Sequence, residues 1–501
     1  MSMIKRILNA HIYDLVEETP VTPARALTQR YQQNIWLKRE DLQPVYSFKL
    51  RGAYNKLLQL SVECRQRGVV AASAGNHAQG LAMAAKHLGI EATIVMPVTT
   101  PAIKIEGVKG RGGNVVLHGD TFDEAARHAN ELSSSNGLYY VHPFDDEDVI
   151  AGQGTIGVEL TKQLASIDAV FLPVGGGGLA AGVAAWLKFC RPEVKIIAIE
   201  PEDAACLKVA LAEGQPTTLG HVGIFADGVA VARIGERTFK HLKHTVDEVV
   251  TCTTDEICAA IKDIFDDTRS IAEPAGALSL AGLKKYLEQT DLPKNGHYVA
   301  IESGANTNFD RLRYISERTE IGEKREAVLA VKIPEKPGSF LSFCDDLGKR
   351  AVTEFNYRYN RAEKAVIYVG LQVSPDGHDR RELVQELIAK GYDVVDLTDN
   401  ELAKLHTRHM VGGVAEVPTE RVFRTKFPER PGALAQFLNA LGGRWNISLF
   451  HYRNHGAAYG RVLFGLNVKD EELDELHRVM KGVGFELIDE THNPAFALFM
   501  K

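Results

Sequence analysis

Lys49 and a run of four glycines are the residues whose types and settings suit chemistry. Lys49 lies in the segment Ser47-Phe48-Lys49-Leu50-Arg51-Gly52, just ahead of a helical pattern, and Ser47 is the predicted N-cap of that helix. The positive field at a helix start disfavours a charged amine, and burial beside Phe48 acts in the same direction. A neutral amine attacks carbonyl groups, so Lys49 is the candidate for imine chemistry.

The alternative interpretation is that Lys49 is an ordinary surface charge. The chain has 58 lysines and arginines, and most residues of these types are solvated. Lys38 and Lys56 are rejected as the nucleophile because their settings look like ordinary charged or amphipathic ones.

The glycine run supplies a second functional group. Gly175, Gly176, Gly177, Gly178 and Leu179 follow an apolar run and open a helical pattern. Bare backbone N–H groups at a helix start form a seat for phosphate. The chain has no nucleotide-triphosphate signature, so an amine combined with a phosphate seat predicts a pyridoxal phosphate enzyme.

A third loop offers polar groups for a substrate. Ser73, Ala74, Gly75, Asn76 and His77 follow the apolar run 69–72 and precede the predicted helix 79–88. The turn presents N–H groups that suit a substrate carboxylate, and Asn76 is placed to hydrogen-bond the ring hydroxyl of the cofactor. The alternative is a plain serine-capped turn. We interpret His77 as structural, because it lies one residue past the loop.

The elements that must position these groups alternate strand and helix up to about residue 320. This alternation predicts an α/β fold with a parallel sheet and with its ligand at the carboxyl ends of the strands. The predicted strands are residues 69–72, 92–96, 114–117, 169–174 and 195–199, and the predicted helices include residues 78–88 and 122–132.

Two glycine motifs imitate nucleotide-binding sites. Gly152-x-Gly154-x-x-Gly157 has no convincing strand before it, and we interpret it as a helix start that tolerates glycine. The run 169–200, with Gly176-x-Gly178 and a terminal Glu200, resembles a dinucleotide-binding unit and keeps a nicotinamide oxidoreductase as the alternative. Four consecutive glycines suit one phosphate group better, and Lys49 would have no role in that alternative.

Beyond residue 319 the chain repeats itself. Residues 332–341 match 426–435, and 391–396 match 484–489, at an offset of 93 to 95 residues. Each copy predicts the order strand, Pro-Gly turn, helix, two strands, helix and strand. The predicted domains are a catalytic domain at 1–320 with a small subdomain at about 41–140, a first module at 325–400, a linker at 401–419 and a second module at 420–495.

Composition and charge exclude several classes of protein. The formal net charge is −7 and no basic run stands out, which argues against nucleic-acid binding. The six cysteines form no C-x-x-C pair, which predicts reduced thiols, a cytoplasmic location and no metal site. The uncharged run 169–187 is long enough for a membrane span, but Pro173 and the glycines split it, so no span is predicted.

The chain resembles the fold type II pyridoxal phosphate enzymes, which have two open α/β subdomains. Within them it is similar to the biosynthetic threonine dehydratases (threonine ammonia-lyases), and the doubled tail resembles two ACT-like regulatory modules. The resemblance covers essentially all of the chain. Besides the three motifs above, it includes the segments 225–230, 273–277 and 302–306.

The resemblance implies a role for each motif. Lys49 would hold the cofactor covalently and then take the α-proton of L-threonine, with L-serine as a secondary substrate. Asn76 would bond the ring oxygen, residues 175–179 the phosphate, and Ser303 the ring nitrogen. The implied products are 2-oxobutanoate and ammonia, in the first committed step of isoleucine biosynthesis.

Two departures from relatives narrow the activity. Serine racemases of this fold carry a serine acid/base where this chain has Ala74, which favours a dehydratase over a serine racemase. L-serine dehydratase stays an alternative. The serine racemases also bind a divalent cation near the segment matching 200–206, where this chain has Cys206 in place of a carboxylate. We therefore expect no divalent site of that kind.

The doubled tail predicts regulation. Tyr357, Tyr452 and Arg453 occupy the strand after the first helix of each copy and are the candidate effector residues. Isoleucine is the expected inhibitor and valine a further candidate effector, and the resemblance implies a homotetramer. The alternatives are that both tyrosines are packing residues, or that the tail serves assembly alone.

Overall fold

The computed structural model divides the chain into two compact units, residues 1–312 and 313–501. We describe each unit by itself. The structure describes residues 2–322, 325–334, 342–343, 346–347, 352–357, 364–374, 378–407, 419–428, 437, 439–441, 444–445, 447–453 and 459–499.

The larger sheet of the first unit has six strands in the order β1-β2-β10-β7-β8-β9. Only β1 is antiparallel to its neighbour, as expected for a sheet built from strand–helix–strand units. The strands are β1 (Val21–Pro23), β2 (Asn34–Arg39), β7 (Ala169–Pro173), β8 (Lys195–Pro201), β9 (Glu248–Cys252) and β10 (His297–Glu302).

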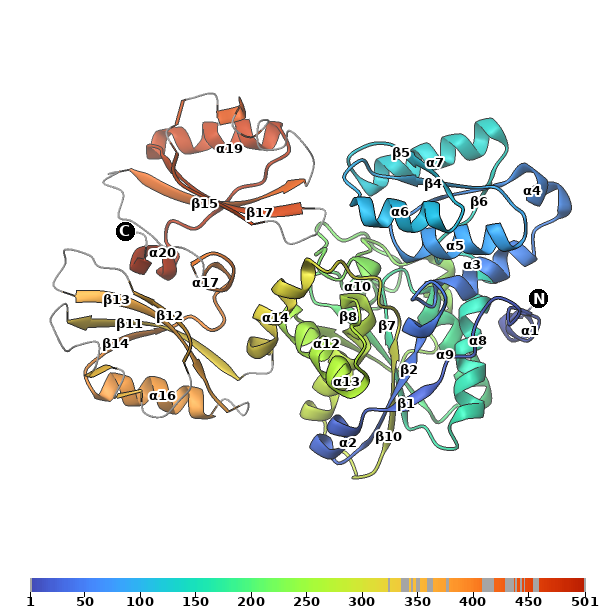
Figure 1. The fold of residues 1–501 in the computed structure, drawn as a ribbon, viewed down its shortest axis with the longest axis horizontal. Helices are drawn as coiled ribbons and strands as arrows, with labels where there is room; N and C mark the ends of the chain where they lie inside the picture. Colours follow the sequence, from blue (N-terminus) through green and yellow to red (C-terminus); the bar gives the residue numbers. More distant parts are fainter. Residues whose placement is uncertain are drawn as a thin grey trace. The chain divides into compact units, whose positions relative to one another are not determined.

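Helices cover both faces of this sheet (Figure 1). Strand β7 shows how, because its side chains alternate between the faces. Val170 and Leu172 belong to the core formed with α8 (Glu147–Gln163) and α9 (Gly178–Cys190). Phe171 points the other way and meets Tyr286 of α13 (Pro274–Gln289) edge to face. The continuous apolar run that predicted this strand therefore reflects burial on both sides.

The smaller sheet has four parallel strands in the order β5-β4-β3-β6. Val69 and Ala71 pack with α3 and α5, whereas Val70 and Ala72 pack with α7. The elements are α3 (Lys49–Leu58), β3 (Val69–Ala72), α5 (Asn76–His87), β4 (Ala92–Met96), α6 (Ala102–Gly110), β5 (Asn114–Leu117), α7 (Phe122–Asn136) and β6 (Tyr139–Tyr140). The predicted strands 69–72, 92–96 and 114–117 are confirmed.

The remaining helical elements of the first unit connect or flank these sheets. They are α1 (Met3–Leu8), α2 (Arg25–Tyr31), η1 (Glu40–Leu42), α4 (Val62–Arg67), α10 (Cys206–Glu213), η2 (Asp227–Val229), α11 (Glu236–Leu242), α12 (Thr254–Thr268) and α14 (Arg311–Gly322), the last of which continues into the second unit.

The interpretation of Gly152-x-Gly154-x-x-Gly157 as a helix start was wrong. The three glycines lie inside α8, which begins at Glu147 behind the N-cap Asp146. A Cβ added at Gly152 would lie 2.5 Å from the carbonyl oxygen of Arg51 in α3. The missing side chains let α8 approach its neighbouring helices, so the motif serves packing.

The second unit holds two antiparallel four-stranded sheets of matching order, β12-β13-β11-β14 and β16-β17-β15-β18. Strand β11 (Glu326–Pro334) pairs with β13 (Lys364–Gln372) as β15 (Glu420–Pro428) pairs with β17 (Tyr459–Asn467). The pairing of β12 (Val352–Tyr357) and that of β16 (Ile447–Arg453) each contain one register shift near the start. The sequence repeat is thus a repeat of structure.

Each sheet of the second unit carries a helix on one face. Helix α16 (His378–Ala389) covers the first core and α19 (Leu473–Gly482) the second. A further core joins residues of both sheets, among them Val328, Tyr368, Val422 and Leu463. The remaining elements are β14 (Asp393–Asp396), α17 (Glu401–Leu405), η4 (Asp470–Glu472), β18 (Ile488–Asp489) and α20 (Pro494–Phe499).

Two features predicted from the sequence lie partly or wholly outside the described residues. Within the predicted linker 401–419, residues 401–405 form α17, and residues 408–418 lie outside the described residues. The Pro-Gly turns at 337–338 and 431–432 lie outside them as well. Among the helices that the structure describes, none has the length and apolar character of a membrane span.

Candidate active site

Lys49 is the first residue of α3, one position later than a Ser47 cap implies. Phe48 occupies the cap position, although the Ser47 hydroxyl accepts a hydrogen bond from the Lys49 N–H at 3.2 Å. The Lys49 amine donates to the carbonyl oxygen of Pro143 at 3.0 Å and lies 5.3 Å from the centre of the Phe48 ring. Burial lowers the pKa of Lys49 to about 8, against the opposing charge of Glu273. The pKa of the amine is therefore lowered in the direction that the sequence predicts, and the neutral form becomes the main one above about pH 8.

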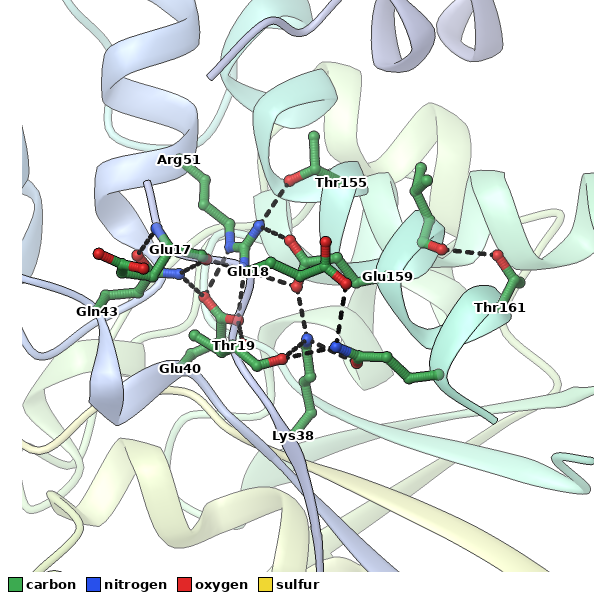
Figure 2. A network of polar contacts seen from close by, with 12 residues as sticks. Glu17, Glu18, Thr19, Lys38, Glu40, Gln43, Arg51, Thr155, Glu159 and Thr161 are labelled. Carbon is green, nitrogen blue, oxygen red and sulfur yellow. Dashed lines mark hydrogen bonds and ion pairs between the residues drawn. The ribbon is translucent and has the colours of Figure 1, made fainter. Parts of the chain in front are cut away.

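A buried ionic network anchors the helix that carries Lys49 (Figure 2). The Arg51 guanidinium lies between Glu40 of η1 and Glu159 of α8, with N–O distances of 2.7 and 2.8 Å to Glu40 and of 2.5 and 3.0 Å to Glu159. Thr155 accepts a further bond at 3.0 Å. The network therefore ties α3 to α8 and to the end of β2.

Lys38 belongs to this network, and its setting was misjudged. Its amine is buried and donates to Glu159 at 2.5 Å and to the carbonyl oxygen of Thr19 at 2.5 Å. Burial lowers the pKa of Lys38 and the two glutamates raise it. Lys56 instead pairs with Asp146 at 2.8 Å, which raises its pKa. Both amines are bonded to carboxylates. This contact, and not an ordinary charged or amphipathic setting, is the reason for excluding Lys38 and Lys56 as the nucleophile.

The four glycines form the turn between β7 and α9. Gly177 has φ of +89°, and a Cβ at Gly176 would lie 2.3 Å from the Phe144 ring. Thr238 donates to the carbonyl oxygen of Gly176 at 2.7 Å, and the Cys206 thiol donates to that of Gly175 at 3.4 Å. The carbonyl groups thus point into the protein and the turn has no room for side chains.

The N–H groups of this turn lie at the start of a helix, where they have no partner within the helix. The residues from Gly175 to Leu179 are buried, and within the described part of the chain no acceptor bonds their backbone N–H groups. Buried N–H groups need partners, so five of them in succession call for an anion. A phosphate group fits this turn.

Lys49 and the glycine turn belong to one site. Pro143, whose carbonyl oxygen accepts from the Lys49 amine, precedes Phe144, whose ring packs on Gly176. Ser303 follows β10, and its carbonyl oxygen accepts from the Phe48 N–H at 3.2 Å. Its buried hydroxyl donates to the carbonyl oxygen of Ala275 at 3.2 Å. An amine, a phosphate seat and a neutral hydroxyl therefore meet at strand ends, which fits a phosphorylated aldehyde cofactor.

The loop 73–77 closes another side of the site. Ser73 follows β3, and Asn76 begins α5, which starts three residues before the predicted position. Residues 73–76 are partly exposed, and a Cβ at Gly75 would meet no atom within 4 Å. The N–H groups of Asn76 and His77, in the first turn of α5, have no acceptor among the described residues, which suits a carboxylate.

His77 has a structural setting. It is buried, and burial together with Lys49 lowers its pKa to about 3, so the ring is neutral. Its Nε2 lies 3.2 Å from the carbonyl oxygen of Val141, which makes Nε2 the protonated nitrogen.

The sequence assigned no role to two residues of the site, Glu273 and Asn306, which both bond the side chain of Asn76. Asn76 donates through Nδ2 to Glu273 at 2.6 Å and accepts through Oδ1 from Asn306 at 2.8 Å. Both partners belong to segments that carry the family resemblance, at 273–277 and 302–306. A carboxylate in front of Pro-Ala-Gly was the available signal, but its partner lies 197 residues away in sequence.

Glu200 does not suit the dinucleotide alternative. Its two oxygens accept the N–H groups of Leu207 and Lys208 at 2.7 and 2.9 Å, and burial raises its pKa to about 7. A ribose would have to displace these bonds. Among the residues described, no group of three or more histidine, cysteine or carboxylate side chains is arranged to hold a metal ion.

For the candidate effector residues the structure describes the position of the backbone only. Tyr357 pairs with Ile367 in the first sheet, and Tyr452 pairs with Val462 in the second. Arg453 is the last residue of β16. The side chains of these three residues lie outside what the structure describes.

Comparison with known proteins extends these findings over the whole chain. The profile of pyridoxal-phosphate-dependent enzymes matches residues 12–304, and that of the C-terminal regulatory domain of threonine dehydratase matches residues 317–407 and 411–500. The L-threonine dehydratase biosynthetic IlvA of Escherichia coli is 52% identical over 498 residues, which span 99% of this chain and 96% of that protein.

Solved structures match a part of the chain. The processed form of threonine deaminase isoform 2 from Solanum lycopersicum is 51% identical, with a TM-score of 0.62 over 63% of this chain and 92% of that one. Maize serine racemase is 31% identical, with a TM-score of 0.60 over 62% of this chain and 95% of that one.

Proposed function

Because the chain belongs to the pyridoxal-phosphate-dependent enzymes, and within them to the biosynthetic threonine dehydratases with a C-terminal regulatory domain, we propose that it converts L-threonine to 2-oxobutanoate and ammonia. Its fold is the type II fold of these enzymes, followed by the regulatory domains. The observation that carries the proposal is the Lys49 amine, whose pKa is lowered to about 8, in one site with the unbonded N–H groups of residues 175–179.

Pyridoxal phosphate, when bound, supplies a ring that withdraws electrons from the α-carbon of an amino acid. We assign the phosphate to the N–H groups of residues 175–179 and the substrate carboxylate to the loop 73–77. In that loop the Ser73 N–H donates to the carbonyl oxygen of Val95 and the Gly75 N–H to the Ser73 hydroxyl, so the N–H groups of Ala74, Asn76 and His77 are the ones left for the carboxylate. Lys49 Nζ removes the α-proton. Asn76 donates to the ring oxygen. The Ser303 hydroxyl, which donates to the carbonyl oxygen of Ala275, would turn to donate to the ring nitrogen and would leave that nitrogen unprotonated, which would favour quick loss of the β-hydroxyl over transamination.

Ala74 supports a dehydratase over a racemase. Racemisation needs a proton donor on the second face of the substrate, and a methyl group cannot supply one. The choice between threonine and serine is less sharp, because one methyl group in an apolar pocket is worth about 1–3 kcal/mol. L-serine dehydratase therefore stays the second candidate function. The ratio of kcat/KM for threonine to kcat/KM for serine, measured on one preparation, distinguishes the two functions.

Borohydride reduction followed by peptide mapping tests the site. We expect one reduced label, on Lys49, together with keto-acid formation from threonine. Lys49→Ala removes both, whereas Lys109→Ala, which changes an exposed lysine of α6, changes neither. A label on another lysine, or oxidation of threonine with a nicotinamide cofactor, would overturn the assignment.

We propose further that isoleucine inhibits the enzyme by binding near Tyr357, Tyr452 and Arg453. The two modules place these tyrosines on equivalent strands, β12 and β16, and the regulatory profile matches the chain twice. An effector acts only by binding two states of the protein unequally. Isoleucine would therefore favour the less active state, and valine is tested as its competitor.

A chain ending at Thr319 should keep turnover and lose isoleucine inhibition. In the full chain, Tyr452→Ala should weaken inhibition and Tyr392→Phe, which removes the contact with Asp346, should not. Calorimetric titration of residues 320–501 with isoleucine should release or absorb heat. An assembly module would give none, and retained inhibition in the truncated chain would end the hypothesis.

The domain boundaries are proposals that rest on the repeat, the cytoplasmic location is one that rests on the scattered cysteines, and the homotetramer is one that rests on the resemblance. The proposed divisions are 1–320, 325–400, 401–419 and 420–495. Sedimentation of the full chain should give about four times the 55.1 kDa chain mass.

A further inference from the structure

Glu273 connects the two sheets of the first unit inside the active site. It precedes α13, which packs on the larger sheet, and its buried side chain accepts a hydrogen bond from Asn76 Nδ2 at 2.6 Å. Asn76 begins α5, which packs on the smaller sheet. The Glu273 N–H donates to the carbonyl oxygen of Gly304 at 3.1 Å, so its backbone is held next to Ser303.

The orientation of the Asn76 amide follows from a chain of donors and acceptors. The main-chain carbonyl oxygen of Val45 can only accept, and Asn306 Nδ2 lies 2.7 Å from it. The other hydrogen of Asn306 Nδ2 meets Asn76 Oδ1 at 2.8 Å. Asn76 Nδ2 therefore faces Glu273. Of its two hydrogens one is bonded to Glu273 and the second is left for another acceptor.

Two glycines leave space for the Glu273 carboxyl group. A Cβ at Gly304 would lie 2.9 Å from Glu273 Oε1, and one at Gly228 would lie 3.4 Å from the same atom. The Gly228 position also lies 3.9 Å from Asn76 Nδ2. The carboxyl group is therefore confined between η2, the end of β10 and the start of α5.

We propose that Glu273 is a positioning residue, which holds one amide hydrogen of Asn76 and so directs the other toward the ring oxygen of the cofactor. The proposal rests on the proposed function, because it uses the assignment of Asn76 to that oxygen. Without an acceptor at position 273, the amide would keep only its bond to Asn306 and would rotate about it.

The charges around Glu273 make this contact sensitive to pH. Burial and the charge of Asp227 raise the pKa of Glu273 to about 7, whereas the Asn76 bond, Lys104 and Arg311 oppose the shift. Lys104 lies 2.7 Å and Arg311 3.3 Å from Asp227, which keeps that carboxylate ionised. From α3, Lys49 faces the group as well. Glu273 therefore changes between acid and carboxylate near neutral pH, and the carboxylate is the stronger acceptor.

Two substitutions of Glu273 distinguish its role as a hydrogen-bond acceptor from the effect of its charge. Glu273→Gln keeps an oxygen acceptor for Asn76 and abolishes the titration, whereas Glu273→Ala removes both. Glu288→Gln, a change of the glutamate that accepts from Tyr31 in an exposed contact, is the control. The holoprotein and the protein freed of cofactor are measured in each case.

The first measurement is cofactor affinity, by fluorescence titration with pyridoxal phosphate. We expect Glu273→Ala to weaken binding about tenfold, which corresponds to one well-placed hydrogen bond. Glu273→Gln should stay within about threefold of wild type. Equal affinity in wild type and Glu273→Ala, at matched folding by circular dichroism, would overturn the proposal.

The second measurement is infrared difference spectroscopy of the cofactor-free protein over about pH 5 to 9. Glu200 and Glu302 are buried acids whose pKa values burial also raises, so the spectrum of each variant at 273 is subtracted from that of wild type to cancel their bands. The subtracted spectrum should contain a buried acid band that disappears with a midpoint near pH 7, and the same subtraction with Glu288→Gln should not. A subtracted spectrum without that band would overturn the titration. If threonine is not a substrate while these results hold, the proposed function fails and the role of Glu273 stands.

Discussion

Arg51→Met should be among the most damaging single substitutions in the first unit. The pocket holds two cations, Arg51 and Lys38, and two carboxylates, Glu40 and Glu159, all of them buried. Methionine leaves two carboxylates for one ammonium group and removes two bonds from each glutamate. Removal of one partner from a buried ion pair costs about 3–5 kcal/mol.

Differential scanning calorimetry of the full chain measures this cost. At roughly 2 °C for each kcal/mol in a unit of this size, the transition of the first unit should fall by about 6–10 °C. Lys109→Met is the control in the same unit, because the Lys109 side chain is 53% exposed in its contact with Glu106. Substitutions at such surface positions cost about 0.5 kcal/mol or less.

The pH dependence identifies the cause. Arg51 holds the pKa of the buried Glu40 carboxyl down against its burial, so without Arg51 that pKa rises above the value in the unfolded chain. Stability from such groups is lost as pH rises, and the penalty of Arg51→Met should therefore grow from about pH 5 to pH 8. Addition of Glu40→Gln should recover part of it. A penalty below about 1 kcal/mol, or one independent of pH, would refute the reasoning.

Three further predictions follow from single contacts. Because the pKa of Lys49 is about 8, the rate at which pyridoxal phosphate reconstitutes the cofactor-free protein should rise about tenfold between about pH 6 and pH 7 and level off above pH 8; a flat profile by absorbance would contradict this. Burial raises the pKa of Glu200 from its ordinary 4.5 to about 7. Glu200 therefore contributes fully to stability below pH 4.5, and this contribution is lost as the pH rises through about 7. The fall in thermal midpoint across that window should flatten in Glu200→Gln. A Cβ at Gly182 would lie 2.3 Å from the carbonyl oxygen of Ile150, so Gly182→Ala should destabilise by about 1–3 kcal/mol in urea unfolding, whereas Gly110→Ala, with open space around it, should not destabilise.

Residue types and local spacing were enough for several parts of the site. Lys49 ahead of a helix and four glycines after an apolar run are local patterns, and each sets a local backbone chemistry. Three of the four strands of the smaller sheet were predicted at their observed bounds, and β6 was not predicted. The runs that form β3 and β4 are almost wholly buried and therefore continuous in sequence. The repeat beyond residue 319 needed no structure to be recognised.

Helix ends and packing glycines were less well predicted. The cap of α3 is Phe48 and not Ser47, and α5 begins at Asn76, before its apolar periodicity becomes visible. The glycines of α8 looked like a tolerated helix start, because nothing local reveals that Arg51 of another helix approaches Gly152. Such contacts depend on how helices cross.

The sequence by itself determined the candidate nucleophile, the candidate phosphate seat and the duplicated tail, because these depend on groups that neighbours along the chain supply. Only the tertiary structure decided which charges are buried and which polar groups meet. Arg51 and Glu159 are 108 residues apart in sequence, and Asn76 and Glu273 are 197 apart. The pKa of a side chain and the direction of an amide depend on what surrounds them in space, and folding alone brings those surroundings together.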